Sequence, residues 1–282
     1  MEIRHRYTTR VILGLFGLTL LIASGMFAAI GVFQENLSEP IPSVQDVYSW
    51  FYDYYDPELP LTHGEQIEII QESPGRGVIY LTFDDGPGPY TAQLLDVLAK
   101  YNVKATFFVT GAGSDDLILR EYNEGHTVAL HTLSHNYAAI YQNVDAYFAD
   151  LYAVQDRVRR ITGQTAILIR FPGGSSNLVS AKYDGGAKIM SRLAREVEAK
   201  GFTYFDWNIS SGDAGGITTA DGVYNTVVNG LVGDGDMVVL QHDIKKYSVD
   251  AVERIIKYGL DNGWSFDKLT AESFTAHHGI NN

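Results

Sequence analysis

The sequence predicts an α/β fold, a distorted (β/α) barrel of about seven parallel strands that is preceded by one N-terminal transmembrane helix. Three observations support this prediction. Strand-like and helix-like segments alternate from Gly77 onward, polar residues follow the ends of successive strand-like segments, and an uncharged apolar run fills residues 11–33. The fold class therefore follows from the order of the segments along the chain.

Seven segments rich in β-branched and aromatic residues are the predicted strands. They are Val78–Phe83, Ala105–Val109, Thr127–Leu130, Ala166–Phe171, Phe202–Trp207, Met237–Leu240 and Trp264–Leu269. Between most of them, apolar residues recur at helical spacing around Leu94, Leu151, Leu193 and Val252. Repeated strand–helix units predict parallel strands. About seven units favour a barrel over an open sheet, although periodicity alone does not establish closure.

Residues 11–33 carry no charged side chain. Roughly 20 residues cross the hydrocarbon core of a bilayer, so this run is long enough to span it. Arginines precede the run and glutamates follow it, which places residues 1–10 in the cytoplasm and the rest outside. We therefore expect a single-pass protein of the cell membrane with its main domain extracytoplasmic. The alternative is a cleaved signal peptide and a secreted protein, although a signal core usually spans only about 7–15 residues.

Two regions follow the apolar run. Residues 34–75 are polar and interrupted by prolines, which predicts an extracytoplasmic stem. Residues 76–282 have the size of one α/β barrel domain. The net charge of −13 offers no basic surface for a nucleic-acid partner. Because the chain has no cysteine, any metal must be bound by His, Asp or Glu.

The polar residues that follow the predicted strands form a pattern. They are Asp84 and Asp85 after the first strand, His131 and His135 after the third, Arg170 with Gly173 and Gly174 at the fourth, Asp213 after the fifth, and His242 with Asp243 at the end of the sixth. The carboxyl ends of parallel barrel strands lie on one face, where active sites form. We therefore expect these side chains to share one site.

Two histidines and one carboxylate are a plausible ligand set for a hydrolytic zinc ion, with a fourth position left for water. The candidates are His131 and His135, in HTLSH, with an aspartate of TFDDGPGP. Their i, i+4 spacing allows both imidazoles onto one side of a single turn. The alternative is an Asx turn that caps the next helix, but such a turn needs only one aspartate and does not explain the histidines. A glycosidase pair is disfavoured, because adjacent acids do not readily flank a glycosidic bond.

Five strings together carry a family resemblance: TFDDGPGPYT, HTLSH, RFPGG, DWNISSGD and LQHD. In order and spacing, the region from Gly77 to Leu269 resembles the NodB-type polysaccharide deacetylases, carbohydrate esterase family 4. The resemblance implies that residues 76–282 are the catalytic domain. It also implies that the protein is a metal-dependent enzyme that removes acetyl groups from a polysaccharide.

The resemblance implies a role for each matched residue. Asp85, His131 and His135 bind one divalent metal ion, usually zinc in this family. Asp84 is the general base that deprotonates the attacking water, and His242 is the general acid for the leaving group. Each role has a physical reason, since a bound metal makes water acidic and a neighbouring carboxylate keeps an imidazole protonated.

The remaining matches are expected to support these groups. By resemblance, Arg170 orients Asp84, and Asp213, rather than Asp206, tunes the acid histidine. The backbone N–H of Gly173 stabilises the oxyanion, Leu240 lies beside the acetyl methyl, and Trp207 is a candidate substrate contact. Many relatives carry Tyr at the position of Gly173 and Trp at the position of Ala214. These departures affect the groove wall and leave the metal chemistry intact.

A membrane anchor near the cell wall makes N-acetylglucosamine of peptidoglycan the leading substrate. Chitin oligomers and acetylated xylan remain open, because no residue in the sequence identifies the sugar. From other classes, a noncatalytic glycan-binding protein on the same scaffold and another metal-dependent barrel hydrolase are the alternatives. Retention of both the base and the acid argues against the first. The absence of an early HxH pair argues against the second.

Overall fold

The computed structural model describes residues 75–282. The predicted cytoplasmic tail, the predicted transmembrane helix and nearly all of the predicted stem lie outside the described residues. Within residues 75–282, no helix combines the length and the apolar character needed to cross a membrane. The described region thus corresponds to the domain predicted for residues 76–282.

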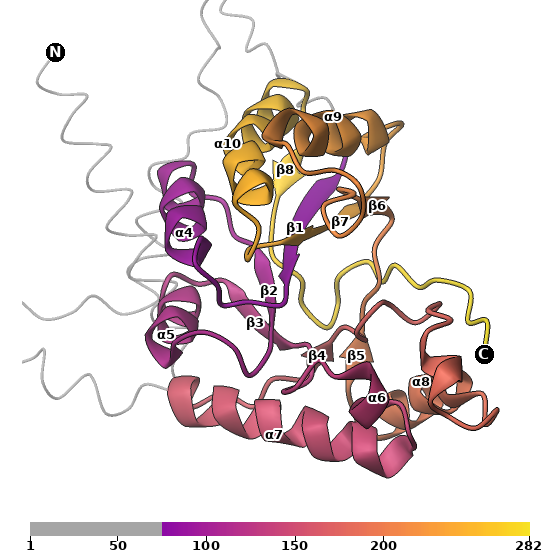
Figure 1. Ribbon diagram of the computed structural model, residues 1–282. Coiled ribbons are helices and arrows are strands. Elements are labelled where there is room, and N and C mark those ends of the chain that lie inside the picture. The colour runs from indigo at the N-terminus through magenta and orange to yellow at the C-terminus, as the bar shows by residue number, and fades with distance from the viewer. Residues whose placement is uncertain (1–74) are drawn as a thin grey trace, which may run out of the picture. The chain divides into compact units, whose positions relative to one another are not determined.

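The strands of this region form one parallel sheet (Figure 1). They are β1 (Val78–Asp84), β2 (Thr106–Val109), β3 (Thr127–Leu130), β4 (Leu168–Ile169), β5 (Thr203–Tyr204), β6 (Ile209–Ser210), β7 (Met237–His242) and β8 (Ser265–Phe266). The hydrogen-bonded order is β5-β4-β3-β2-β1-β7-β6, and β8 pairs with the start of β1. All of these pairs are parallel, which confirms the predicted α/β sheet.

The sheet is a curled half-barrel, because its two end strands, β5 and β6, do not pair with each other among the described residues. Part of the C-terminal segment lies along the outer edge of β5 and the residues after it. The backbone N–H of Asp206 donates to the carbonyl of Ala276 at 2.8 Å, and the ring of His277 stacks on Tyr204 with centroids 3.9 Å apart. The predicted barrel is therefore not closed. Closure would require β6 to pair with the free edge of β5, and the C-terminal segment contacts that edge instead.

Helices lie around the outside of the curled sheet (Figure 1). They are α4 (Thr91–Lys100), α5 (Asp115–Asn123), α6 (Tyr137–Ile140), α7 (Val144–Thr162), α8 (Ile189–Ala199), α9 (Ala220–Gly230) and α10 (Lys246–Asp261), with a 3₁₀ turn at Ser180–Lys182. The four predicted helices are confirmed as α4, α7, α8 and α10. Helices α5 and α9 were not predicted, because each buries only two side chains and its apolar periodicity is short.

Strand β1 shows how the core positions the site. Ile79, Leu81 and Phe83 belong to the large cluster that packs the sheet against the helices. Tyr80 belongs to a smaller cluster on the other face. Because side chains alternate along a strand, Asp84 shares the inner face with Tyr80. The same strand therefore supports the hydrophobic core with one face and presents a buried carboxylate with the other.

Candidate active site

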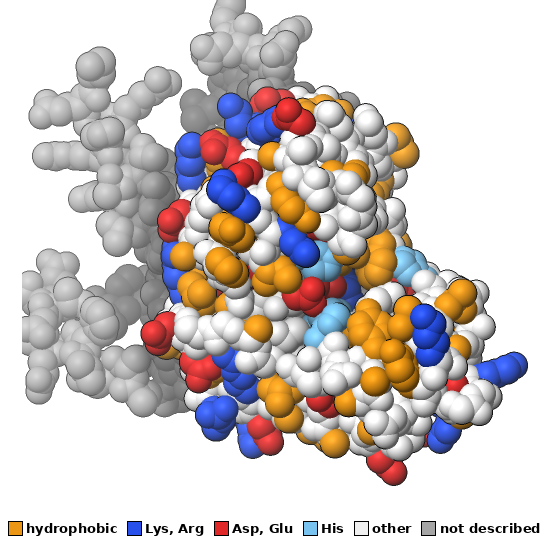
Figure 2. Space-filling model, viewed as in Figure 1, with side chains coloured by type: hydrophobic (Ala, Val, Ile, Leu, Met, Phe, Trp, Pro, Cys, Tyr) orange, Lys and Arg blue, Asp and Glu red, His pale blue; other side chains and the backbone are white. Residues whose placement is uncertain are grey.

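Most of the predicted site residues converge at the carboxyl ends of the strands. Asp84 ends β1 and His242 ends β7, and these two residues are register partners in adjacent strands. Figure 2 shows acidic and histidine side chains gathered in a hollow on this face. The structure brings five of the predicted residues together. Contacts shorter than 4 Å connect Asp84, Asp85, His131, His135 and His242.

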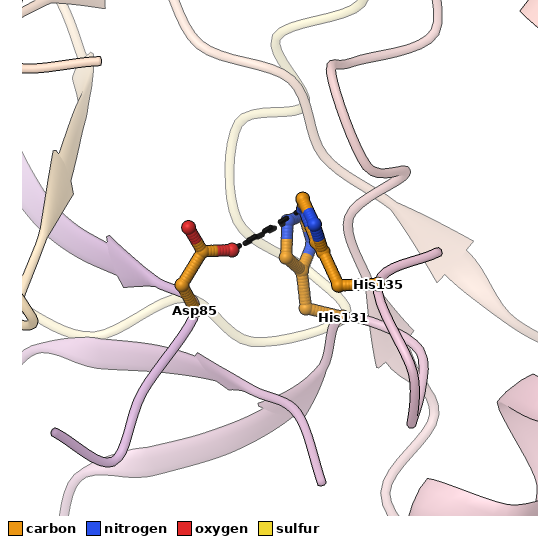
Figure 3. A group of neighbouring side chains, drawn as sticks. All are labelled: Asp85, His131 and His135. Atoms are coloured by element: carbon orange, nitrogen blue, oxygen red, sulfur yellow. Dashed lines mark ion pairs between the residues drawn. The ribbon is translucent and has the colours of Figure 1, made fainter. Parts of the chain in front are cut away.

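Asp85, His131 and His135 point toward one another (Figure 3). Their ligand atoms all lie within 4.8 Å of one another. Oδ1 of Asp85 is 3.3 Å from Nε2 of His135 and 3.6 Å from Nε2 of His131. That oxygen is buried and has no hydrogen-bond partner among the described residues. A buried acceptor between two imidazoles fits a divalent ion held by two nitrogens and one carboxylate.

The environment of His131 suits a metal ligand. Its Nδ1 lies 2.8 Å from the carbonyl oxygen of Arg170, so the ring donates there and Nε2 keeps its lone pair. Burial lowers the pKa of His131 to about 3, although the charge of Asp85 acts in the opposite direction. The imidazole is therefore neutral at physiological pH and can coordinate an ion without first losing a proton.

The HTLSH segment is a loop without a helical turn, and it still brings both imidazoles to one side, as their spacing allows. Thr132 has φ of 65° and His135 has φ of 50°, values in the left-handed region that non-glycine residues rarely adopt. The backbone N–H groups of Leu133 and Ser134 both donate to Oδ1 of Asp150 on α7. This carboxylate holds the loop in the shape that brings the two rings together, with centroids 5.1 Å apart.

Asp84 is held by a fully buried arginine. Nη1 of Arg170 donates to Oδ1 of Asp84 at 2.8 Å and to Oγ1 of Thr82 at 2.7 Å. Burial raises the pKa of Asp84, while the charges of Arg170 and His242 lower it. The other oxygen, Oδ2, lies 3.7 Å from Nε2 of His131 and faces the metal set. The structure thus places one carboxylate oxygen on the arginine and the other toward the site.

His242 is held by a second buried carboxylate. Its Nδ1 lies 2.8 Å from Oδ1 of Asp213, and its backbone N–H donates to Oδ2 of the same residue. Burial lowers the pKa of His242, but the hydrogen bond and charge of Asp213, with Asp84 and Asp85, raise it to about 9. Asp213 follows β6, a two-residue strand that the sequence did not predict. The expected pairing of Asp213 with the acid histidine is present.

Gly173 lies in a loop with a left-handed backbone, at φ of 80°. A Cβ atom there would lie 2.7 Å from the hydroxyl oxygen of Tyr137, so the space beside Gly173 is filled from α6. Trp207 is half-buried against the backbone of Gly174. Leu240 is buried on β7, two residues before His242 and on the same face of the strand.

Asp206 has a structural role that the sequence did not predict. Its side chain accepts hydrogen bonds from the backbone N–H groups of Ser175 and His278, both at 2.8 Å. It therefore fastens the Gly173–Ser175 loop to the C-terminal segment, and among the described residues it makes no hydrogen bond to His242. In the sequence, only the position of Asp206 directly after a predicted strand pointed to a role for this residue.

The arrangement defines a class of protein. Asp84 and His242 both lie within 4 Å of a residue of the His-His-Asp set, and each is fixed by its own buried partner. Hydrolysis at a metal centre needs a base for the water and an acid for the leaving group in this relation. The geometry is that of a metal-dependent hydrolase.

Comparisons with known proteins give the family. The family model for polysaccharide deacetylase matches residues 71–186. A peptidoglycan-N-acetylglucosamine deacetylase from Bacillus cereus is 36% identical over 207 residues, which is 70% of this chain and 71% of the relative. Chitin deacetylase 1 from Cryptococcus neoformans is 30% identical over 69% of this chain and 43% of its own length.

A solved structure agrees with these sequences. The catalytic domain of peptidoglycan N-acetylglucosamine deacetylase from Eubacterium rectale is 49% identical, with a TM-score of 0.71 over 74% of this chain and 96% of that chain. The chain belongs to the polysaccharide deacetylase family, carbohydrate esterase family 4, and is an enzyme with a His-His-Asp metal-binding set. The noncatalytic alternative and the alternative barrel hydrolase are thereby excluded.

The ligand set predicts a loss of metal on substitution. We expect His131→Ala and His135→Ala each to lose most of their affinity for a divalent ion, because two remaining ligands hold an ion poorly. Metal content after dialysis, measured by elemental analysis, checks this. The matched control is His277→Ala, an exposed histidine outside the set, which should bind like the wild type. Undiminished stoichiometric binding by the His131 and His135 variants would show that the ligand set is wrong.

Proposed function

We propose that this enzyme hydrolyses the acetamide group of N-acetylglucosamine in peptidoglycan. The observation that carries the proposal is the pair of anchored groups beside the metal set, Asp84 on Arg170 and His242 on Asp213. The sugar is supported by relatives, since the Bacillus cereus protein and the Eubacterium rectale structure are both named as peptidoglycan N-acetylglucosamine deacetylases. Zinc is our proposal for the metal, because two imidazoles and a carboxylate are a usual zinc set.

Asp84 acts as the general base. Arg170 occupies its Oδ1, which leaves Oδ2 facing the metal set as the atom that accepts a proton from the attacking water. An ion bound by Asp85, His131 and His135 would polarise the acetyl carbonyl and lower the pKa of water. Arg170 also fixes the direction of the carboxylate, because it donates to Thr82 and to the carbonyls of the chain after β5 as well.

His242 acts as the general acid. Its Nδ1 is occupied by Asp213, and its Nε2 lies 3.9 Å from Oδ2 of Asp85, so the free nitrogen faces the site. When the carbon–nitrogen bond of the acetamide breaks, Nε2 gives its proton to the departing amine. Acetate and a free amino sugar are the products. Asp213 keeps the imidazole protonated until this step, because its charge raises the pKa of His242.

Two further residues complete the site. The backbone N–H of Gly173 donates to the oxygen of the acetyl group as negative charge develops on it. The left-handed backbone of Gly173 suits this role, because the loop can approach the substrate closely where there is no side chain. Leu240, buried beneath His242 on β7, lies beside the acetyl methyl.

The protein acts outside the cytoplasm, attached to the cell membrane through residues 11–33. The length of this apolar run and the arginines before it support the proposal. Membrane fractionation and sequencing of the mature N-terminus test it. The expected result is a membrane-bound protein that retains its N-terminus, and a mature end between Ala23 and Glu39 would show a cleaved signal peptide instead.

The substrate is tested by acetate release from purified peptidoglycan, chitin oligomers and acetylated xylan. We expect the highest kcat/KM on peptidoglycan and no release from any of the three after chelation of the metal. The Asp84→Asn enzyme, assayed at a temperature where it stays folded, is the matched control for contaminating esterase. It should keep its metal, because Asp84 is not a ligand, and lose roughly 10²–10⁴-fold in rate. Faster release from chitin oligomers or acetylated xylan would reassign the substrate and leave the chemistry in place.

The acid role of His242 predicts a dependence on the leaving group. We expect His242→Ala to lose far more rate on an N-acetyl sugar than on an aryl acetate, because an amine needs a proton to leave and a phenolate scarcely does.

In the wild type, activity on the amide should fall as pH rises through the raised pKa of about 9, where His242 loses its proton. Asp213→Asn removes the charge that raises this pKa, so the alkaline limb should move to lower pH by about 1–2 units. If His242→Ala lowered the rate equally on the N-acetyl sugar and on the aryl acetate, His242 would not be the general acid.

A further inference from the structure

Tyr137 lies at the site and has no assigned role. It begins α6, two residues after His135, and its ring packs edge-on against the His135 ring with centroids 5.4 Å apart. Its hydroxyl oxygen lies 2.7 Å from where a Cβ of Gly173 would be. The phenol therefore lies between a metal ligand and the backbone group that we propose as the oxyanion donor.

The hydroxyl of Tyr137 makes no hydrogen bond to any residue between 75 and 282, whereas its neighbour Tyr141 donates to the carbonyl of Pro172 at 2.7 Å. The side chain is only partly buried. A phenol in such a position usually finds a partner, so an unpaired one that is open to the site is suited to donate to a ligand.

The ring of Tyr137 is held in place from several sides. It packs against the rings of His135 and Tyr141, and Tyr141 in turn stacks with Tyr147 of α7. The side chain of Asn136 accepts the backbone N–H groups of Ala138 and Ala139, which fixes the start of the helix that carries the tyrosine. A donor held in this way needs little reorganisation when charge develops next to it.

We propose that the Tyr137 hydroxyl is a second donor to the acetyl oxygen, beside the backbone N–H of Gly173. The two groups are neighbours, so one substrate oxygen can lie within reach of both. Gly173 has no side chain at the point where the phenol enters, so the two residues are complementary in shape. The proposal rests on the deacetylase activity and on the role proposed for Gly173, and it is independent of which sugar is bound.

The experiment uses Tyr137→Phe, which keeps the ring and removes the hydroxyl. We expect kcat to fall roughly 10–100-fold with little change in KM, since the lost hydrogen bond strengthens only in the transition state. The fall should occur on an N-acetylglucosamine substrate and also on 4-nitrophenyl acetate, which has an acetyl oxygen but no sugar. Tyr152→Phe is the matched control, because Tyr152 is an exposed tyrosine on α7 outside the site.

Three other outcomes would overturn the proposal. A raised KM on the sugar with unchanged hydrolysis of 4-nitrophenyl acetate would make Tyr137 a contact to a sugar hydroxyl. Loss of bound metal or a lowered unfolding midpoint in Tyr137→Phe would make it a structural residue. Unchanged kinetics on both substrates would leave it without a role in the reaction. If the wild type hydrolyses 4-nitrophenyl acetate but not peptidoglycan, the proposed substrate fails, and the comparison on the aryl ester still decides the role of Tyr137.

Discussion

The ion pair between Arg170 and Asp84 is the interaction on which both the site and the inner face of the sheet depend. Arg170 is fully buried, and its guanidinium lies 4.2 Å from the ring centre of Phe108. It bonds Asp84 at the end of β1 and the carbonyls of Phe205 and Asp206 after β5. Removing either charge would leave the other buried and unpaired, which would lower the free energy of unfolding by roughly 3–5 kcal/mol. One arginine thus fixes the direction of Asp84, the proposed base, and joins strands that do not lie next to each other in the sheet.

The parts that could be predicted from the sequence are those with strong local patterns. Seven apolar segments gave the parallel sheet, because β-branched runs separated by amphipathic helices have few other solutions. The polar residues at the strand ends, such as Asp84 and His242, could be assigned to one face because parallel strands end together. The pairing of Asp213 with His242 came from the family resemblance, and the distance of 2.8 Å now supports it.

The parts that could not be predicted depend on contacts between distant segments. Strand β6 has two residues, too few for a periodic signal, so Asp213 was counted after the wrong strand. The open edge of β5 is covered by Ala276 and its neighbours, about 70 residues away along the chain, and no local pattern reports such a contact. The positive φ of Thr132 and the placement of Tyr137 beside Gly173 likewise follow from the tertiary fold.

The alternation along β1 also limits how such an enzyme can evolve. Phe83 packs in the core and the adjacent Asp84 faces the site, so a one-residue insertion within this strand would exchange a core side chain for the proposed base. The parts of the loops that carry no metal ligand and no proposed donor have no such restriction. Insertions and substitutions around Ala214 can reshape the substrate groove while the strand ends keep their chemistry. Divergence toward new acetylated polymers is therefore expected to accumulate in the loops, with the strands inherited almost unchanged.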